Sequence, residues 1–354
     1  MRLESKVHSG TVFTAAPIRN VLSVVLAVLM TALLQLAPAY GQAMRTYVSG
    51  TGKDGTACTL ANPCRTLQTA LGLTRPGGEI QSLDSADYGY VTINQAVTLL
   101  GAHGATGVLA ANVSGVTINA GANDVVTLKG LEIDGSGSGV NGIQFNSGAA
   151  LNVQDSVIRG FAAGIRFQPS SASSFLVSGT ILANNTTGVL FQTSSPSNGV
   201  LVDAHLVNNG IGAIVQGASS TTVATLSVQN GVVANNASVG LISNGYSVVT
   251  ASGTTIANNG IGVQAQGSNA VLQLAGATVS GNGSGSIATS GGQVSSLSGN
   301  NSIGGNLAAN SVPATSVSPT PTPSPSPSPV AMDYVTDGTG NYVSDSTGAK
   351  VTTL

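Results

Sequence analysis

Two stretches decide the fold: LVSGTILANNTTGVLF at residues 176–191 and LVDAHLVNNGIGAIV at residues 201–215. Each combines an apolar–x–apolar strand pattern, a turn, a second apolar pair, an Asn-Asn step and another short strand. Versions of the same pattern follow at residues 226–242, 249–264 and 272–287. The period is roughly 23 to 27 residues, which is the range of solenoid repeats. The sequence therefore predicts a solenoid of short strands.

Aligned on the Asn-Asn step, the repeats place aliphatic residues in the same columns. Positions two residues apart in a strand lie on one face of it, so two such columns predict one buried face. The first column holds Val126, Leu151, Phe175, Gly199, Leu226, Val249 and Leu272, and the second holds Leu128, Val153, Val177, Leu201, Val228, Ala251 and Leu274. Phe145, Phe167 and Phe191 share a later column, which predicts an internal aromatic stack.

Amide side chains also recur in columns. One column holds Asn184, Asn208, Asn235 and Asn258, the next holds Asn185, Asn209, Asn236, Asn259 and Asn282, and Gln168, Gln192 and Gln216 form a shorter row. Asn tolerates the left-handed backbone of a sharp corner, and stacked amides hydrogen-bond to the copies above and below. We interpret these rows as structural ladders, with ligand binding by the Asn rows as the alternative.

From about Thr46 to Asn306 the chain resembles the pectate-lyase-like right-handed parallel β-helix proteins. The segment YVSGTGKDGTAC…NPCRTLQTAL…GGEI, starting at Tyr47, is similar to the opening of many exported members. The resemblance implies a short helix that plugs the N-terminal end of the solenoid. The right-handed winding of the solenoid follows from the resemblance and from the general bias of parallel crossovers.

The sequence around this helix predicts its limits and its buried side. Asn62 is expected to cap it, and Pro63 to occupy its first turn. The Pro76-Gly77-Gly78 step is expected to end it. The apolar stripe is formed by Leu67, Ala70 and Leu71.

Composition agrees with an all-β solenoid and excludes one class of partner. Only 7% of the 354 residues are charged and 4% are aromatic, while glycine occurs 47 times. Low charge with abundant small and β-branched residues favours many short strands joined by tight turns. The formal net charge is −2, so the chain lacks the basic footprint of a nucleic-acid-binding protein.

The N-terminus is typical of a secretory signal peptide. Arg2, Lys6 and Arg19 precede an apolar run over residues 21–37, and small residues lead up to an expected cleavage after Ala43. An uncleaved membrane anchor is the alternative. Cleavage predicts a mature chain without a membrane span that is secreted, periplasmic or on the cell surface.

Export also bears on the two cysteines. Cys58 and Cys64 form the only pair, in the turn-rich segment CTLANPC. In an oxidising compartment we expect a local disulfide between them, with a two-cysteine metal site as the alternative.

The mature chain divides into four expected parts. An N-terminal cap with the cysteine pair covers residues 44–90, and the β-helix repeats cover residues 91–311. A Pro/Ser/Thr linker follows at residues 312–330. The short C-terminal tail, residues 331–354, contains a tandem repeat and is expected to attach the protein to a surface or partner.

The resemblance implies two kinds of active site. Lyases of such folds use clustered carboxylates that hold calcium and an Arg or Lys that removes a proton, whereas hydrolases use paired carboxylates. The chain has no Asp, Glu, Lys or Arg between Ala204 and Met332. The candidate catalytic residues are therefore those of a central charged patch: Asp155, Arg159, Asp203 and His205. They match no carboxylate cluster, so no metal or cofactor is expected, and calcium enters only if the chain is a lyase.

Two functions follow from these observations. The first is a secreted, monomeric β-helix scaffold that binds extracellular polysaccharide or a cell surface without catalysis. The alternative is a polysaccharide lyase, epimerase or hydrolase that acts on a uronic-acid polymer with a reduced active site in the central charged patch. Fold resemblance alone does not decide between them.

Overall fold

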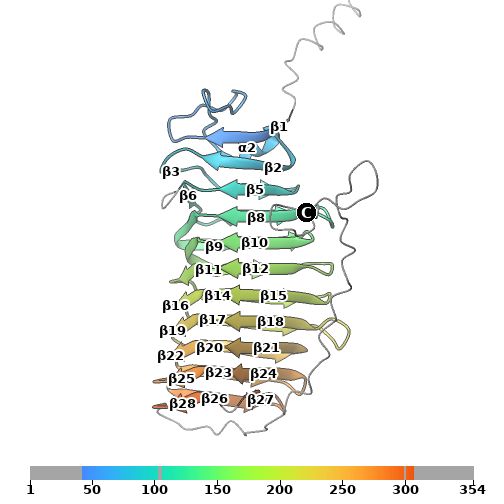
Figure 1. Cartoon of the computed structure of the whole chain (residues 1–354), viewed down its shortest axis with the longest axis vertical. Coiled ribbons are helices and arrows are strands. Elements are labelled where there is room, and N and C mark those ends of the chain that lie inside the picture. The colour runs from blue at the N-terminus through green and yellow to red at the C-terminus, as the bar shows by residue number, and fades with distance from the viewer. Residues whose placement is uncertain (1–41, 103–105, 299, 307–354) are drawn as a thin grey trace, which may run out of the picture.

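A computed structural model describes residues 42–102, 106–298 and 300–306, and it shows a parallel β-helix. Figure 1 shows the strands stacked as rungs along the long axis, from β1 at one end to β28 at the other. One face is an eleven-stranded sheet in which every pairing is parallel. Its strands, in spatial order, are β1 (Ala43–Val48), β2 (Thr74–Ser82), β5 (Val97–Leu100), β8 (Val125–Lys129), β10 (Ala150–Gln154), β12 (Ser174–Ser178), β15 (Ser197–Val202), β18 (Ala224–Gln229), β21 (Ser247–Ser252), β24 (Ala270–Ala275) and β27 (Gln293–Ser296).

The remaining strands form two further parallel rows. Strands β9 (Leu131–Ser147) and β11 (Val157–Phe167) run through both rows. The row of short strands contains β3 (Ala86–Asp87), β6 (Thr106–Leu109), β13 (Ile181–Ala183), β16 (His205–Val207), β19 (Val232–Ala234), β22 (Thr255–Ala257), β25 (Thr278–Ser280) and β28 (Ser302–Gly304). The other row contains β4 (Val91–Ile93), β7 (Val116–Asn119), β14 (Thr187–Thr193), β17 (Ile211–Gly217), β20 (Val239–Gly245), β23 (Ile261–Gln266) and β26 (Ser284–Thr289).

The strand register confirms the columns predicted from the repeats. Leu151 pairs with Val126 on one side and with Phe175 on the other, and the column continues through Gly199. Apart from that glycine, its aliphatic and aromatic members are buried in one continuous core. A parallel β-helix is thus confirmed, and each coil contributes the same inward positions.

The predicted aromatic stack is also confirmed, and a fourth ring joins it. The Phe145 and Phe167 rings stack with centroids 4.5 Å apart, and Phe191 meets Phe167 edge-on at 5.4 Å. Phe175 enters from the eleven-stranded sheet, 4.6 Å from Phe167. A Cβ at Gly199 would lie only 2.2 Å from Phe175 Cζ, so glycine interrupts the aliphatic column where this ring needs the space.

The inner asparagine column forms a buried ladder. At each step the Oδ1 atom of the next Asn accepts bonds from both the backbone N–H and the Nδ2 of the one before, as between Asn209 and Asn236 at 3.0 and 3.2 Å. The same Nδ2 also donates to a backbone carbonyl of the preceding coil. The ladder extends one step beyond the predicted set, to Asn306. The outer column has the predicted left-handed backbone, with φ of 56° at Asn184, Asn208, Asn235 and Asn258.

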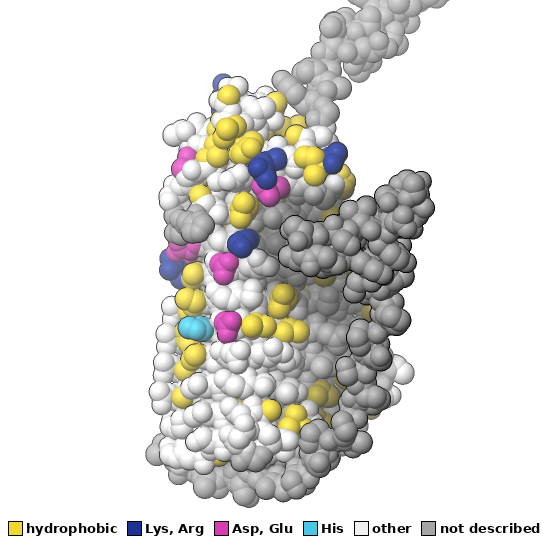
Figure 2. Space-filling view, in the orientation of Figure 1, with side chains coloured by type: hydrophobic (Ala, Val, Ile, Leu, Met, Phe, Trp, Pro, Cys, Tyr) yellow, Lys and Arg dark blue, Asp and Glu magenta, His cyan; other side chains and the backbone are white. Residues whose placement is uncertain are grey.

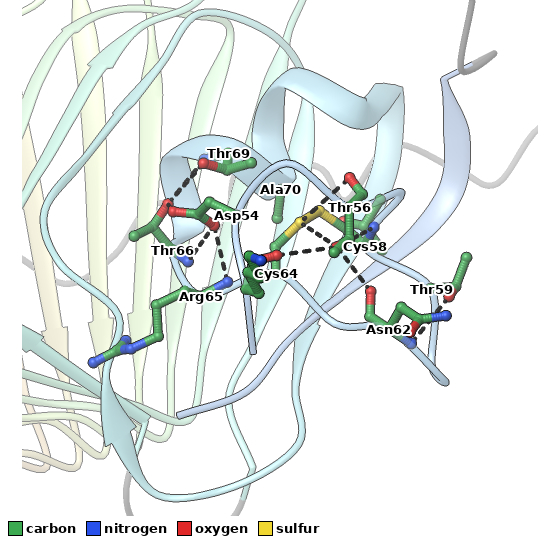
Figure 3. Close-up of a disulfide and its surroundings, with 12 residues drawn as sticks. Asp54, Thr56, Cys58, Thr59, Asn62, Cys64, Arg65, Thr66, Thr69 and Ala70 are labelled. Carbon is green, nitrogen blue, oxygen red and sulfur yellow. Dashed lines mark hydrogen bonds between the residues drawn. A yellow bond between two sulfur atoms is a disulfide. The ribbon is translucent and has the colours of Figure 1, made fainter. Parts of the chain in front are cut away.

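The N-terminal helix is shorter than predicted. Helix α2 (Leu67–Leu73) begins after Thr66, whose hydroxyl accepts the Thr69 N–H, and Asp54 in turn accepts the Thr66 N–H (Figure 3). The predicted Asn62 cap is therefore wrong, because residues 59–62 close a turn of their own. The predicted end is also wrong: the helix stops at Thr74, and Pro76-Gly77-Gly78 lie in β2.

The rest of the predicted cap is present. Leu67, Ala70 and Leu71 are buried, and α2 packs against β1, β2 and β4. Cys58 and Cys64 form the predicted disulfide, which Figure 3 shows beside α2. Helix α2 and the disulfide loop thereby cover β1, the first strand of the sheet, whose edge would otherwise be exposed.

Asp84 ties the first coils together and makes the cap sensitive to acid. Its carboxylate accepts bonds from Ser49 Oγ, Gly50 N and the Tyr88 hydroxyl at 2.6, 2.8 and 2.5 Å. The Ser49 bond, followed by those from Tyr88 and Gly50, lowers the carboxyl pKa below its ordinary 3.8. A folded-state pKa below the unfolded one gives stabilisation that is complete above the unfolded value and is lost as pH falls through the folded value.

We therefore expect Asp84→Asn to flatten the acid limb of the stability profile. Thermal unfolding followed by circular dichroism between about pH 2 and 6 should show a steeper loss of Tm below the ordinary carboxyl pKa in the unmodified protein than in the variant. Parallel profiles for the two proteins would contradict this assignment.

Several predicted segments lie outside the described residues. These are the signal peptide up to residue 41, the linker at residues 312–330 and the tail at residues 331–354. Within the described residues, no helix has the length and apolar character needed to cross a bilayer.

Candidate functional site

Charged side chains gather in the N-terminal part of the solenoid. Figure 2 shows Lys, Arg, Asp and Glu over the upper part of one face, while the lower part of that face is free of them among the described residues. The sequence accounts for this, because Asp203 is the last charged residue before the linker. The four candidate catalytic residues lie at the lower border of the charged region.

Arg159 is held by two carboxylates. Its Nε lies 2.8 Å from Asp134 Oδ2 and its Nη2 lies 2.6 Å from Glu132 Oε1, with 44% of the side chain exposed. Asp134 is the residue paired with Arg159 in the adjacent coil, and Glu132, two residues earlier on the same face, is a second partner. Burial raises the pKa of Asp134, but the Ser136 N–H and Arg159 outweigh it and lower that pKa. In turn, the hydrogen bond to Asp134 raises the pKa of Arg159. This guanidinium therefore holds its proton and is an unsuitable proton acceptor.

Asp155 and Asp203 are corner residues of the solenoid. Both have a left-handed backbone, with φ of 49° and 51°. Backbone bonds place them in one column, two coils apart with Gly179 between them, so they are separated by about 10 Å. The column continues with Asn230, also left-handed, which explains why only Asp, Asn and Gly occur in it. Asp155 has a distant ion pair with Lys129, 3.6 Å from Oδ2 to Nζ.

His205 lies on the outward face of β16 and is exposed. Its neighbours in the adjacent coils are Ile181 and Val232, which offer no group to share a proton. Arg159 lies two coils away in the next outward column. No ion pair joins the four candidates to one another: Arg159 pairs with Glu132 and Asp134, and Asp155 pairs with Lys129. His205 follows Asp203 by two residues, and Figure 2 shows the histidine beside an acidic side chain.

A different feature has the shape of a binding site. An open groove of about 650 Å³ runs along the C-terminal ends of β11, β14 and β17, where each coil turns toward the eleven-stranded sheet. Its lining is Asn146, Gln168, Pro169, Ser170, Gln192, Thr193, Ser194, Gln216 and Ala218, and none of these side chains is charged. We call it the amide groove.

The amides of this groove come from successive coils. Each follows a residue of one paired column: Phe145, Phe167, Phe191 and Val215. The sequence predicted the glutamines as a structural ladder, but only Gln192 Nε2 to Gln216 Oε1 forms a bond between them, at 3.2 Å. Gln168 Oε1 instead accepts Arg166 Nη2 at 2.7 Å. The groove itself depends on the loops that follow these strands, and those vary from coil to coil, so the repeat pattern gave no signal for it.

Comparison with known proteins identifies the family. Residues 100–282, just over half of the chain, match the family described as "Periplasmic copper-binding protein (NosD)". The chain belongs to the NosD family. No curated protein matches this NosD chain by sequence.

Solved structures give more distant similarities to this NosD chain. Pectate lyase Pel9A aligns at 15% identity over 87% of each chain with a TM-score of 0.47. The A-module of mannuronan C-5 epimerase AlgE4 from Azotobacter vinelandii aligns at 15% identity over 68% of this chain and 88% of that one, with a TM-score of 0.42. ORF18 of Geobacillus virus E2 aligns at 16% identity over 72% and 59%, with a TM-score of 0.45.

The family description names copper, and the donor atoms of the described residues do not fit it. Copper prefers imidazole, thiolate and thioether ligands. Among the described residues, His205 is the one histidine, Met44 the one methionine, and both cysteines are in the disulfide. The described residues contain no group of three His, Cys, Asp or Glu side chains placed to hold a metal ion.

We therefore expect the purified protein to retain well under one copper per chain. The full exported chain would be incubated with Cu(I) or Cu(II), dialysed, and analysed for metal by atomic spectroscopy. Because His205 is the strongest described donor, His205→Ala serves as the matched variant. One tightly held copper per chain that this substitution removes would contradict the donor-set argument.

Proposed function

We propose that this chain is an exported β-helix scaffold that binds polysaccharide at the amide groove without catalysing a reaction. The groove carries the proposal. It is concave and open along the stack, and it presents several amide groups in a row, one from each coil. A regular row of polar groups suits a regular polymer, because each coil can contact one part of the bound chain.

The environment of the ionisable residues supports binding without turnover. Proton abstraction requires a base within hydrogen-bond reach of the substrate proton, oriented by neighbouring groups. Arg159 is held between Asp134 and Glu132, and Asp155 and Asp203 serve as corners two coils apart. None of these side chains lines the amide groove.

Export to the periplasm or beyond is part of the proposal. It rests on the N-terminal signal-like sequence, on the disulfide and on the periplasmic description of the NosD family. Such a location gives the protein access to envelope and extracellular glycans.

The test is retention by polysaccharide. The purified exported chain would be run through native gels containing one dissolved polysaccharide each: laminarin, glucomannan, xyloglucan, alginate or polygalacturonate. Retarded migration in at least one gel is the expected result, and unchanged migration in every gel would overturn the proposal. Arg159→Ala is expected to be retarded to the same extent as the unmodified protein, each relative to its own migration without polysaccharide, because Arg159 does not line the groove.

A further inference from the structure

Building on the proposed function, we infer that the amide groove is selective for neutral polysaccharide chains, bound through Gln168, Gln192 and Gln216. The inference rests on which polar atoms of these residues are left without a protein partner, and on the charge of their surroundings.

The glutamines leave amino-group donors and a carbonyl acceptor without a hydrogen-bond partner in the protein. An arginine side chain only donates, so the two bonds from Arg166 fix Gln168 with its carbonyl oxygen toward Arg166, at 3.0 and 2.7 Å. The Gln168 amino group then has no hydrogen-bond partner among the described residues. Gln192 and Gln216 share one bond, and whichever way round the two amides lie, that bond leaves one carbonyl oxygen and one amino group free.

The row therefore offers an amino group at one coil, then a free carbonyl and a further free amino group over the next two coils, which lie about 5 Å apart. A sugar hydroxyl both donates and accepts hydrogen bonds, so it can pair with either kind of free group. Thr193 and Ser194 add hydroxyls to the same lining. A carboxylate only accepts, so it can pair with the free amino groups but not with the free carbonyl, which would repel it.

Electrostatics also favour a neutral chain over a polyanion. The lining of the groove has no charged side chain, and no charged residue follows Asp203 before the linker. The cation Arg166 contacts the row, and its bonds to the neutral Gln168 leave its positive charge in place, so it can pair with one carboxylate of a bound polymer. A uronate chain carries a carboxylate on every sugar, so beside this single cation most of its carboxylates would lose hydration without gaining compensating charge.

The groove also differs in place from the charged patch. Asp155 and Asp203 lie at the corners that follow the eleven-stranded sheet, whereas the amides lie at the ends of β11, β14 and β17, which precede that sheet. The two surfaces can therefore be tested separately.

The experiment measures affinity for neutral and acidic polymers with matched variants. Laminarin, glucomannan and xyloglucan would be compared with alginate and polygalacturonate by isothermal titration on the full exported chain, at low and at high salt. We expect a neutral polymer to bind with little salt dependence and uronans to bind at least about tenfold more weakly. The double substitution Gln192→Ala with Gln216→Ala should weaken neutral binding about tenfold or more, since it removes both free groups.

Gln264→Ala is the matched control. Gln264 lies on the outward side of β23, in the same row of strands but outside the groove lining. Its substitution is therefore expected to leave the affinity for neutral polymers unchanged. Stronger, salt-sensitive binding of uronans, or neutral binding that survives the double substitution, would overturn this inference while leaving polysaccharide binding intact. Binding of none of the five polymers would overturn the proposed function as well.

Discussion

Replacing Phe167 by alanine is expected to lower the free energy of unfolding by about 3–5 kcal/mol. The ring is fully buried and lies within 4.5 to 5.4 Å, centroid to centroid, of Phe145, Phe175 and Phe191. Its removal leaves a cavity that three other rings border. Parallel strands on both sides fix the backbone, so the coils cannot close around the space.

Urea denaturation followed by circular dichroism would measure this loss. Phe167→Leu is the control, because it keeps most of the volume and should cost no more than about 1.5 kcal/mol. Equal effects of the two substitutions would show that the aromatic stack does not stabilise the centre of the solenoid.

The second large effect is expected at the asparagine ladder. Asn236→Ala should lower the free energy of unfolding by about 2–4 kcal/mol, since several buried groups lose their partners. Its Oδ1 accepts the Asn209 N–H and Nδ2, while its Nδ2 donates to Leu206 O and Asn259 Oδ1. The side chain is 1% exposed, so water cannot replace these bonds.

The neighbouring residue provides a matched control for this substitution. Asn235 is exposed, belongs to the outer column and has φ of 56°, a conformation that glycine adopts without strain. Asn235→Gly should change stability by less than about 1 kcal/mol. If Asn236→Ala in a urea titration costs no more than this control, the ladder is not a stabilising element.

Much of the fold could be predicted because a solenoid repeats the same local chemistry. From β13 onward each coil places apolar residues inward, an Asn or Gly at the corner and an Asn at the next position, so an ambiguous alignment of one coil is resolved by the others. The columns headed by Val126 and Leu128 and the inner Asn row follow from this alone. The α2 cap occurs once, and its start depends on Asp54, twelve residues away in sequence, which a local capping rule does not see.

The site was harder to predict, because its features depend on side-chain partners. Asp155 and Asp203 share one column with Gly179, and a glycine at that position is the signal in the sequence for the corner geometry that explains them. The repeats also predicted the row of glutamines. Which of their donors and acceptors are free depends on the bond from Arg166 to Gln168, because this bond replaces one step of a continuous glutamine ladder.

One preparation can test the central claim, binding without catalysis, most directly. The full exported chain would be incubated with each of the five polymers, with and without calcium, while retention, polymer chain length and the ultraviolet absorbance of unsaturated product are measured together. The account predicts that a polymer is retained, that its chain length is unchanged and that no absorbance develops. Cleavage or rising absorbance that Arg159→Ala abolishes would contradict it and would place an active site in the charged patch.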